Sequence, residues 1–233
     1  MKYAIISDIH SNLEALTKAL TIIDEKNVDE IICLGDIVGY GANPNECVDI
    51  VRSRSAAVVL GNHDAAALDT AQAHDFNAIA RKAVFWTAEQ LTAESKSYLL
   101  SLPMVERKEQ ILFVHSSPDS PEAWDYVIDN DDADSALDHF KEKICFIGHT
   151  HVPGIFSHHG RAKLITPDEQ FLINVGSVGQ PRDGNPKLAF GIFDSSAWEY
   201  ELIRSQYDIQ KAADKIYAAK LPEELGNRLM YGM

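Results

Sequence analysis

The sequence predicts an α+β fold in which two mixed β-sheets pack face to face and helices cover their outer faces. In the first half of the chain, short apolar runs alternate with segments of helical periodicity, which is typical of parallel strands joined by right-handed crossovers. In the second half, strand-like runs come in pairs around short turns, which is typical of hairpins. No internal repeat or low-complexity tract separates the halves, so we expect one domain over residues 1–233.

The chain contains five apolar runs of three or four residues that are predicted to be buried strands, because they are rich in aliphatic and β-branched side chains. They cover residues 4–6, 31–34, 57–60, 111–114 and 144–147. Between them, Ser11 and Glu14 have the spacing of a capping box, and Pro44 suits a first helical turn. The predicted helices run from Ser11 to Ile23 and over residues 44–54, 76–91 and 93–100.

The second half is predicted to hold two hairpins, one further strand and a closing helix. Glycine between two apolar runs predicts the first hairpin, and apolar side chains at helical spacing predict the helix. The first hairpin joins residues 154–159 to 162–165 around Gly160, the single strand covers 171–174, the second hairpin joins 188–193 to 198–203, and the helix covers 207–219.

The chain has 233 residues, a formal net charge of −14 and a pI of about 5. Tight binding of nucleic-acid polymers needs a basic stripe, and the densest charge run, over residues 129–134, is acidic instead. We expect this run to be a solvated loop or the start of a helix. An acidic surface repels a phosphorylated substrate unless positive charge lies in the cleft, and bound metal ions would supply that charge.

No apolar stretch is long enough to span a bilayer, and the N-terminus runs into a strand without room for a signal peptide. The three cysteines are odd in number and match no zinc-binding spacing. Cys33 and Cys145 lie inside apolar strands, where a thiol behaves as a small hydrophobic group. We therefore expect a cytoplasmic protein with no membrane partner, and the sequence is compatible with a homo-oligomer.

Each of the five predicted strands is followed by polar residues able to bind a metal ion. Open α/β sheets place their ligands beyond the carboxyl ends of the strands, so these side chains are expected to meet in one crevice. Two aspartates, one asparagine and four histidines predict a two-metal site and a hydrolase of phosphate esters. The residues are Asp8, His10, Asp36, Asn62, His115, His149 and His151.

The donor types restrict the metals. Four imidazoles argue against magnesium and calcium, which prefer all-oxygen shells, and no thiolate is present. Manganese, iron, zinc, cobalt and nickel all remain admissible on the chemistry of these side chains.

The ordered series Asp-x-His, Gly-Asp, Gly-Asn-His-Asp, a lone His after a strand, and Gly-His-x-His resembles the calcineurin-like metallophosphoesterases. The resemblance covers residues 2 to about 200. Residues 35–44 and 174–183 look closer to a bacterial and archaeal branch that contains small phosphodiesterases and enzymes cleaving diadenosine tetraphosphate. The resemblance implies a four-layer α/β/β/α sandwich, which agrees with the two sheets predicted above, and it places manganese and iron first among the metals.

The resemblance also implies residue roles. One metal would be held by Asp8, His10, Asp36 and His151, and the second by Asp36, Asn62, His115 and His149, with Asp36 bridging the two. A hydroxide bridging the metals would attack phosphorus in line, and His63 would protonate or stabilise the leaving oxygen.

The sequence departs from the family pattern at Gly39. Many phosphoprotein phosphatases of the superfamily carry at this place an aspartate that pairs with the histidine corresponding to His63. Asp64 is the candidate substitute, although its neighbouring position in the chain can direct it elsewhere.

Three further residues are candidates for substrate contacts. Asn12 would bind phosphate or cap the following helix, and Arg182 would bind phosphate or pair with Asp183. Tyr40 would stack on a ring of the substrate or pack on its neighbours.

We therefore expect hydrolysis of small phosphodiesters or phosphoanhydrides, with dinucleoside polyphosphates among the candidates. The absence of an aspartate at Gly39 makes a phosphoprotein or phosphomonoester phosphatase the weaker alternative. A non-catalytic scaffold on the same fold is a second alternative, and it is disfavoured because every expected ligand and His63 are present.

Overall fold

The structure, a computed structural model, describes residues 1–233 without a gap. Its first sheet has the strand order β11-β10-β1-β2-β3, in which β1, β2 and β3 are parallel and β10 and β11 run antiparallel. The bounds are β1 Lys2–Ile6, β2 Glu30–Cys33, β3 Ala57–Val58, β10 Leu188–Asp194 and β11 Glu199–Ser205.

The second sheet has the order β4-β5-β6-β9-β7-β8, with β5, β6 and β9 parallel and the other pairs antiparallel. The bounds are β4 Val105–Lys108, β5 Ile111–Val114, β6 Ile144–Ile147, β7 Gly154–Ser157, β8 Gly160–Arg161 and β9 Phe171–Asn174. Both sheets are therefore mixed: the parallel strands lie at one side of the first sheet and in the middle of the second.

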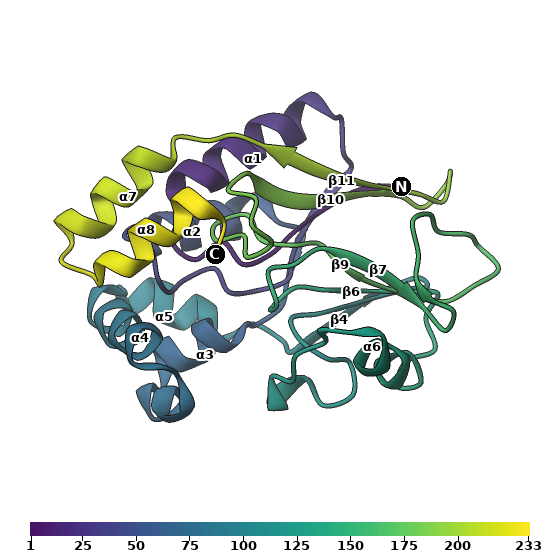
Figure 1. Ribbon diagram of the computed structural model, residues 1–233, viewed down its shortest axis with the longest axis horizontal. Helices are drawn as coiled ribbons and strands as arrows, with labels where there is room; N and C mark the ends of the chain where they lie inside the picture. Colours follow the sequence, from purple (N-terminus) through teal and green to yellow (C-terminus); the bar gives the residue numbers. More distant parts are fainter.

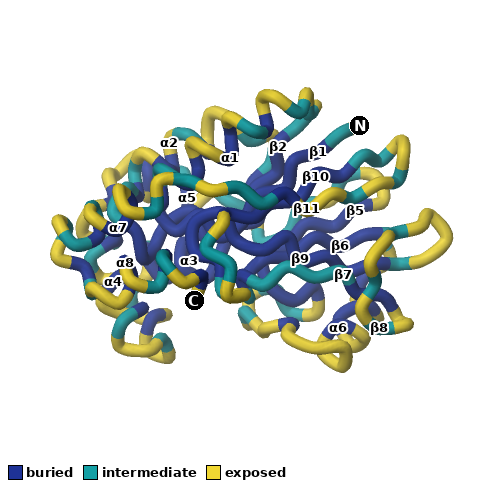
Figure 2. Tube along the Cα trace, turned by 45° about the horizontal axis from the view of Figure 1, so that its top comes forward, coloured by how far each residue is buried: buried dark blue, intermediate teal, exposed yellow.

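The two sheets face each other across an apolar layer. Alternate residues of a strand point to opposite faces; in β1, Tyr3 and Ile5 enter the layer between the sheets. Phe113 and Phe146 enter it from the second sheet, and their rings stack at 5.8 Å between centroids. Figure 2 shows these central strands as a continuous buried zone with the exposed residues outside it.

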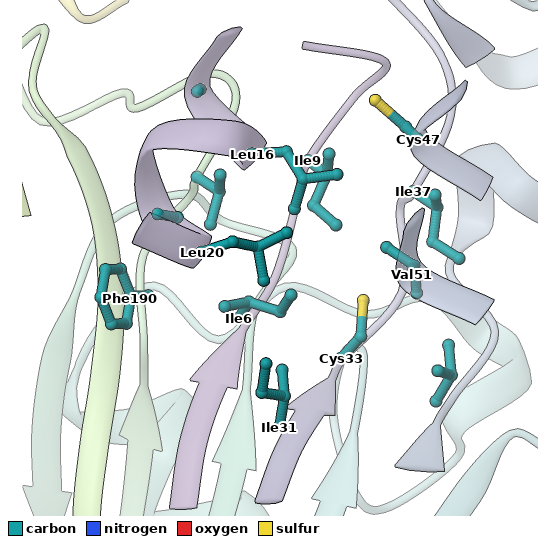
Figure 3. Packing of buried hydrophobic residues seen from close by; sticks show 14 of the residues in the cluster. Ile6, Ile9, Leu16, Leu20, Ile31, Cys33, Ile37, Cys47, Val51 and Phe190 are labelled. Atoms are coloured by element: carbon teal, nitrogen blue, oxygen red, sulfur yellow. The ribbon is translucent and has the colours of Figure 1, made fainter. Parts of the chain in front are cut away.

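The remaining residues of β1, Ala4 and Ile6, pack on the outer side of the first sheet against helices. Figure 3 shows Leu16 and Leu20 of α1 above Ile6 and Ile31, with Val51 of α2 nearby. On the outer side of the second sheet, apolar residues pack against α6. The helices are α1 Leu13–Glu25, α2 Pro44–Arg54, α5 Ala93–Leu100 and α6 Asn130–Leu137. The fold is thus the four-layer α/β/β/α sandwich that was predicted (Figure 1).

A further group of helices gathers at the end of the sandwich toward which the parallel strands point (left in Figure 1). A separate apolar cluster, which includes Tyr40, Ala83, Ile216 and Leu225, joins three of them to the loop after β2. The helices are α3 Asn62–Leu68, α4 Ala78–Gln90, α7 Ile209–Ala218 and α8 Glu223–Tyr231, with short 3₁₀ turns η1 Thr70–Asp75 and η2 Pro121–Ala123.

Several sequence-based boundaries are corrected. The cap of α1 is Asn12, whose side chain accepts a hydrogen bond from the Ala15 amide at 3.1 Å, and not Ser11. The return strand of the first hairpin begins at Gly160 itself and is only two residues long. α7 does not close the chain, because α8 follows it, and α3 and β4 were not expected.

The expected acidic run over residues 129–134 is the start of α6, capped by Asp129, whose carboxylate accepts from two backbone amides. The three cysteines are free and buried. None of the helices combines the length and apolar character needed to cross a membrane.

Candidate metal centre

The candidate site lies where the loops after the parallel strands of both sheets meet. Asp8 follows β1, Asp36 follows β2, His115 follows β5 and His149 follows β6. Backbone hydrogen bonds hold the loops of the first sheet together, from the Asp8 amide to the Gly35 carbonyl (3.1 Å) and from the His10 amide to the Asp36 carbonyl (2.9 Å). The His149 amide donates to Oδ2 of Asp8 at 3.0 Å and so links the two sheets.

Four of the predicted ligands form a first group whose donor atoms all lie within 4.8 Å of one another: Asp8, His10, Asp36 and His151. Nε2 of His151 lies 3.2 Å from Oδ1 of Asp8 and 3.1 Å from Nε2 of His10. Nε2 of His10 lies 3.6 Å from Oδ2 of Asp36. This is the set predicted for the first metal, and all four residues are buried.

A second group contains Asp36, His115 and His149, again with donor atoms within 4.8 Å. Nε2 of His115 lies 3.4 Å from Oδ2 of Asp36 and 3.2 Å from Nδ1 of His149. Oδ1 of Asn62 is 3.1 Å from the same nitrogen. The set predicted for the second metal is therefore assembled, and Asp36 is the one residue common to both groups.

Backbone carbonyls orient three of the imidazoles. Nδ1 of His10, His115 and His151 lies 3.1, 2.8 and 2.6 Å from the carbonyl oxygens of residues 38, 34 and 180. A carbonyl only accepts, so each Nδ1 carries the proton and each neutral ring turns the lone pair of Nε2 into the site. The facing nitrogens of His10 and His151 therefore have no proton between them when both rings are neutral, an arrangement that a cation would stabilise.

The loops that carry the predicted metal ligands adopt an unusual backbone conformation. Asp8, His10, Asp36, His149 and His151 all have φ between 50° and 66°. This left-handed region costs a residue with a side chain about 1–2 kcal/mol. Residues in such conformations persist only where the surroundings hold them, and they cluster at functional sites.

Charges within the site oppose the effect of burial on the two carboxyl groups. Burial alone raises the pKa of Asp36, but the neighbouring imidazoles of His115 and His63 hold this pKa well below its usual range. The imidazole of His151 lowers the pKa of Asp8 in the same way. Both aspartates are therefore ionised at neutral pH.

The pKa values of the buried histidines shift in different directions. Burial lowers the pKa of His10 and of His151, which leaves both rings neutral and able to bind metal. Burial also acts to lower the pKa of His115, but the Asp36 carboxylate outweighs it and raises this pKa to about 9.

The residues fit a pair of metal ions. Oδ1 of Asp8 is buried without a hydrogen-bond partner. Buried acceptors in this state are costly unless a ligand completes them. Imidazole nitrogen with carboxylate and amide oxygen is a donor set that suits manganese, iron, zinc, cobalt or nickel.

His63 lies beside this centre without a carboxylate partner. Its amide donates to Oδ1 of Asp36 at 2.8 Å, while its Nδ1 is buried and has no hydrogen-bond partner. Burial lowers the pKa of His63 to about 4. Asp64 is not the substitute partner, because its two oxygens accept from the amides of Val38 (3.0 Å) and Gly61 (3.2 Å).

Packing explains the glycine at position 39. Gly39 has φ of +93°, and a Cβ added there would lie 2.7 Å from Nδ1 of His63. The His63 ring also contacts Tyr40 and Phe76, with centroids 4.4 and 4.9 Å away. An aspartate at Gly39 is therefore incompatible with the present position of the His63 ring.

The other predicted substrate contacts are placed as follows. Asn12 caps α1, and its amide group donates to the carbonyl of Gly179 (2.8 Å) and to the hydroxyl of Tyr207 (3.1 Å), so its polar atoms are used within the protein. Tyr40 is buried against His10, at 4.6 Å between centroids, which agrees with packing on its neighbours.

Arg182 does not pair with Asp183, which instead forms an ion pair with Arg204. Its guanidinium donates to Oε1 of Gln180 at 3.0 Å and to the hydroxyl of Tyr40 at 3.3 Å. The charge of Arg182 therefore has no carboxylate partner and lies next to the aromatic side chains that cover the metal ligands.

Two residues of the surroundings were missed by sequence analysis. Tyr126 stacks on the imidazole of His149 at 4.0 Å between centroids, although it lies in an irregular segment with no periodic signal. Arg228 comes from α8, a helix that was not predicted, and it reaches the same region as Arg182 and Tyr126. Recognising α8 from Leu225 and Leu229, which are both buried, would have placed Arg228 on a packed helix.

Comparison with known proteins shows the family of this chain. The family model of the calcineurin-like phosphoesterase superfamily domain matches residues 1–197. A crystal structure of a metallophosphoesterase from Sphaerobacter thermophilus is 38% identical and superposes with a TM-score of 0.91 over 100% of this chain and 99% of that chain. An uncharacterized protein of Methanocaldococcus jannaschii is 41% identical over 98% of this chain and 97% of its own length.

The match to the symmetrical bis(5'-nucleosyl)-tetraphosphatase of Glaesserella parasuis is partial, with 33% identity over 52% of this chain and 46% of that protein. The chain belongs to the calcineurin-like phosphoesterase superfamily. It is accordingly a metal-dependent hydrolase of phosphoric esters, as the sequence predicted.

Proposed function

We propose that the protein hydrolyses small phosphodiesters or phosphoanhydrides, including dinucleoside polyphosphates, at a dinuclear metal site. The observation that carries this proposal is the convergence of seven side chains in two groups that share Asp36. A shared carboxylate holds two cations close together while reducing their mutual repulsion. When bound, the two metal ions would supply Lewis-acid activation of the phosphate and of a water nucleophile.

The protein's own groups have separate tasks in this scheme. Asp8, His10, Asp36 and His151 would hold one metal, and Asp36, Asn62, His115 and His149 the other. The carbonyl-bound Nδ1 protons of three histidines fix the rings so that no reorientation is needed on binding.

His63 would donate a proton or a hydrogen bond to the leaving oxygen. Its Nδ1 is free of protein partners, and its ring lies edge-on to His10 at 4.9 Å between centroids. The backbone hydrogen bond from His63 to Asp36 ties its position to that of the shared ligand. The ring is thus held beside the predicted metal ligands, with Nδ1 buried next to Gly39, so a substrate would reach the other ring nitrogen.

The partial likeness to the tetraphosphatase supports the substrate class, because dinucleoside polyphosphates contain phosphoanhydride bonds. For the cofactor we propose manganese or iron, with zinc, cobalt or nickel as the other metals that the donor set suits. We further propose that the 233 residues act as one catalytic domain.

The test is a substrate panel measured on protein of known metal content. It contains bis(p-nitrophenyl) phosphate, diadenosine tetraphosphate, a cyclic nucleotide, p-nitrophenyl phosphate and a phosphopeptide, each with added manganese, iron or zinc. We expect turnover of the diesters or anhydrides to exceed that of the monoester and the phosphopeptide. Turnover of the phosphopeptide alone would favour a phosphoprotein phosphatase, and no hydrolysis with any metal would favour a scaffold.

A further inference from the structure

Next to the metal centre is a second hollow that none of the metal ligands lines. Six residues surround it, and they come from five separate parts of the chain: Tyr40, Asn77, Tyr126, Arg182, Arg228 and Met233. Two of the six are arginines, which is unusual for a protein with a formal net charge of −14. Positive charge is therefore concentrated at one place beside the site.

Neither arginine of the hollow is neutralised within the protein. Four of the eight arginines form ion pairs with carboxylates, namely Arg52, Arg54, Arg107 and Arg204. Arg182 and Arg228 make no ion pair, and Arg228 donates no side-chain hydrogen bond. An arginine fork without a carboxylate partner is suited to bidentate binding of a phosphate.

The hollow adjoins the metal ligands through two tyrosines. Tyr40 packs on His10 at 4.6 Å, and Tyr126 stacks on His149 at 4.0 Å between centroids. The guanidinium of Arg182 lies 5.7 Å from the centroid of Tyr40 and donates to its hydroxyl. Tyr126 lines the same hollow as Arg182, which therefore lies beside both rings.

Two other features of the hollow suit a nucleotide. Tyr126 is 51% exposed although one face covers His149, which leaves part of its ring open to a ligand. The side-chain oxygen of Asn77 caps α4, whereas its amide nitrogen makes no hydrogen bond within the protein. A donor and an aromatic surface are thus available beside the two guanidinium groups.

We infer that this hollow binds a second phosphate group of the substrate, held between Arg182 and Arg228, while the phosphate to be cleaved lies at the metal centre. This inference rests on the proposed function and narrows its substrate class to molecules with at least two phosphate groups. It also explains how an acidic protein attracts such a substrate, because the positive charge of the site extends beyond the metals.

The test compares inhibition of bis(p-nitrophenyl) phosphate hydrolysis by AMP and by ADP, at a fixed concentration of free manganese. The two inhibitors differ by one phosphate group. In the wild-type protein we expect ADP to have an inhibition constant at least about tenfold lower than AMP, because a bidentate charge-assisted contact contributes on this scale. In Arg228→Gln and Arg182→Gln this ratio should fall to near one.

The matched control is Arg81→Gln, since Arg81 is exposed on α4 and also lacks an ion pair, but does not line the hollow. It should keep the wild-type ratio of the two inhibition constants. Equal inhibition by AMP and ADP in the wild-type protein, or an unchanged ratio in Arg228→Gln, would overturn the inference.

Failure of the proposed function can be distinguished from failure of the second phosphate site. If the wild-type protein hydrolysed no phosphoester with any metal, calorimetric titration of the manganese-loaded protein with ADP and AMP would replace inhibition. Tighter binding of ADP that depends on Arg228 would then support the second phosphate site without catalysis. Equal binding of ADP and AMP would refute that site as well.

Discussion

The interior of a strand and the residues just beyond its end differ sharply in this molecule. Within β1, Tyr3 and Ile5 pack between the sheets, and Ala4 and Ile6 pack against helices. Two residues beyond β1, Asp8 has φ of 53° and carries a buried charge. The same change occurs after β2 and β6. The residues within the strands are stabilised by regular backbone geometry and by the burial of apolar side chains. The residues beyond the strand ends have left-handed backbone conformations and hydrogen-bond acceptors without partners. A bound ligand would supply those partners.

We infer from this difference that the packed apolar layers provide the stability that holds the residues of the site in strained conformations. Each strained ligand position costs about 1–2 kcal/mol, and five of them lie close together. The closely packed layers on both faces of each sheet are the nearest source of compensating stability. Changes at the strand ends should therefore affect metal content and turnover, and changes in the bodies should affect stability.

The largest effect is expected at the shared ligand. Asp36→Asn removes the one carboxylate common to both groups and should lower kcat about a thousandfold or more, which corresponds to about 4 kcal/mol. Metal content, measured by plasma emission spectroscopy, should fall below two ions per chain. Unfolding in urea should change little by comparison. A variant that keeps two metals and near-normal turnover would show that Asp36 does not bridge them.

His63→Asn tests a residue of α3 that lies beside the site but is not a predicted ligand. Loss of a proton donor typically lowers kcat by about 10²–10⁴-fold. Metal content should remain that of the wild type, which separates this variant from Asp36→Asn. Gly39→Ala is the companion change, because its Cβ would press on the His63 ring. Wild-type kcat in His63→Asn would remove the residue from the reaction.

In a strand body, Phe146→Ala removes a fully buried ring from the layer between the sheets. The free energy of unfolding should fall by about 3–5 kcal/mol, measured by urea denaturation of the metal-free protein. Leu164→Ala is the control, since this side chain is 81% exposed and should change stability by less than about 0.5 kcal/mol. Similar losses in both variants would contradict the assignment of Phe146 to the core.

The pH dependence of metal binding is a further test of the difference between the strand interiors and the residues beyond the strand ends. The pKa of His115 is raised to about 9, and a proton on Nε2 excludes a metal from that nitrogen. Affinity for the second metal should therefore rise with pH, by about tenfold per unit between pH 7 and pH 9. Competition with a chelator of known affinity measures it. His115→Asn should bind more weakly and lose this slope; a slope retained in the variant would assign the proton elsewhere.

The smallest effect concerns the strained backbone itself. His151→Gly and His151→Ala both remove the imidazole, but only glycine suits φ of 62° without strain. The glycine variant should be more stable than the alanine variant by about 1 kcal/mol in urea denaturation. At the exposed His139, outside the left-handed region, alanine should be the more stable choice. The same order at both positions would argue against strain at His151.

The sequence allowed the strand bodies and the ligands to be predicted because both follow local rules. Apolar runs such as residues 144–147 give buried strands, and a polar side chain directly after such a run lies at the edge of the sheet. Asp36 and His151 were placed by this reasoning, and the structure brings their donor atoms together. The arrangement in two packed sheets was predicted from the mixture of crossovers and hairpins.

What could not be predicted depends on contacts between distant segments. Arg182 was weighed against a pairing with Asp183, but Arg204, from another strand, takes that aspartate. The carboxyl group of Asp64 accepts hydrogen bonds from the amides of Val38, after β2, and Gly61, after β3, which no spacing in the sequence reveals. Left-handed conformations at aspartate and histidine also leave no compositional trace, in contrast to those at glycine.

β1 is hydrogen-bonded to β2 on one side and to β10 on the other, although β10 lies more than 180 residues further along the chain. During synthesis the edge of β1 that pairs with β10 therefore stays unpaired until β10 has emerged from the ribosome. The Nδ1 partner of His151, the carbonyl of Gln180, is likewise made late. The orientation of His151, a predicted metal ligand, is therefore fixed only after residue 180 has been synthesised.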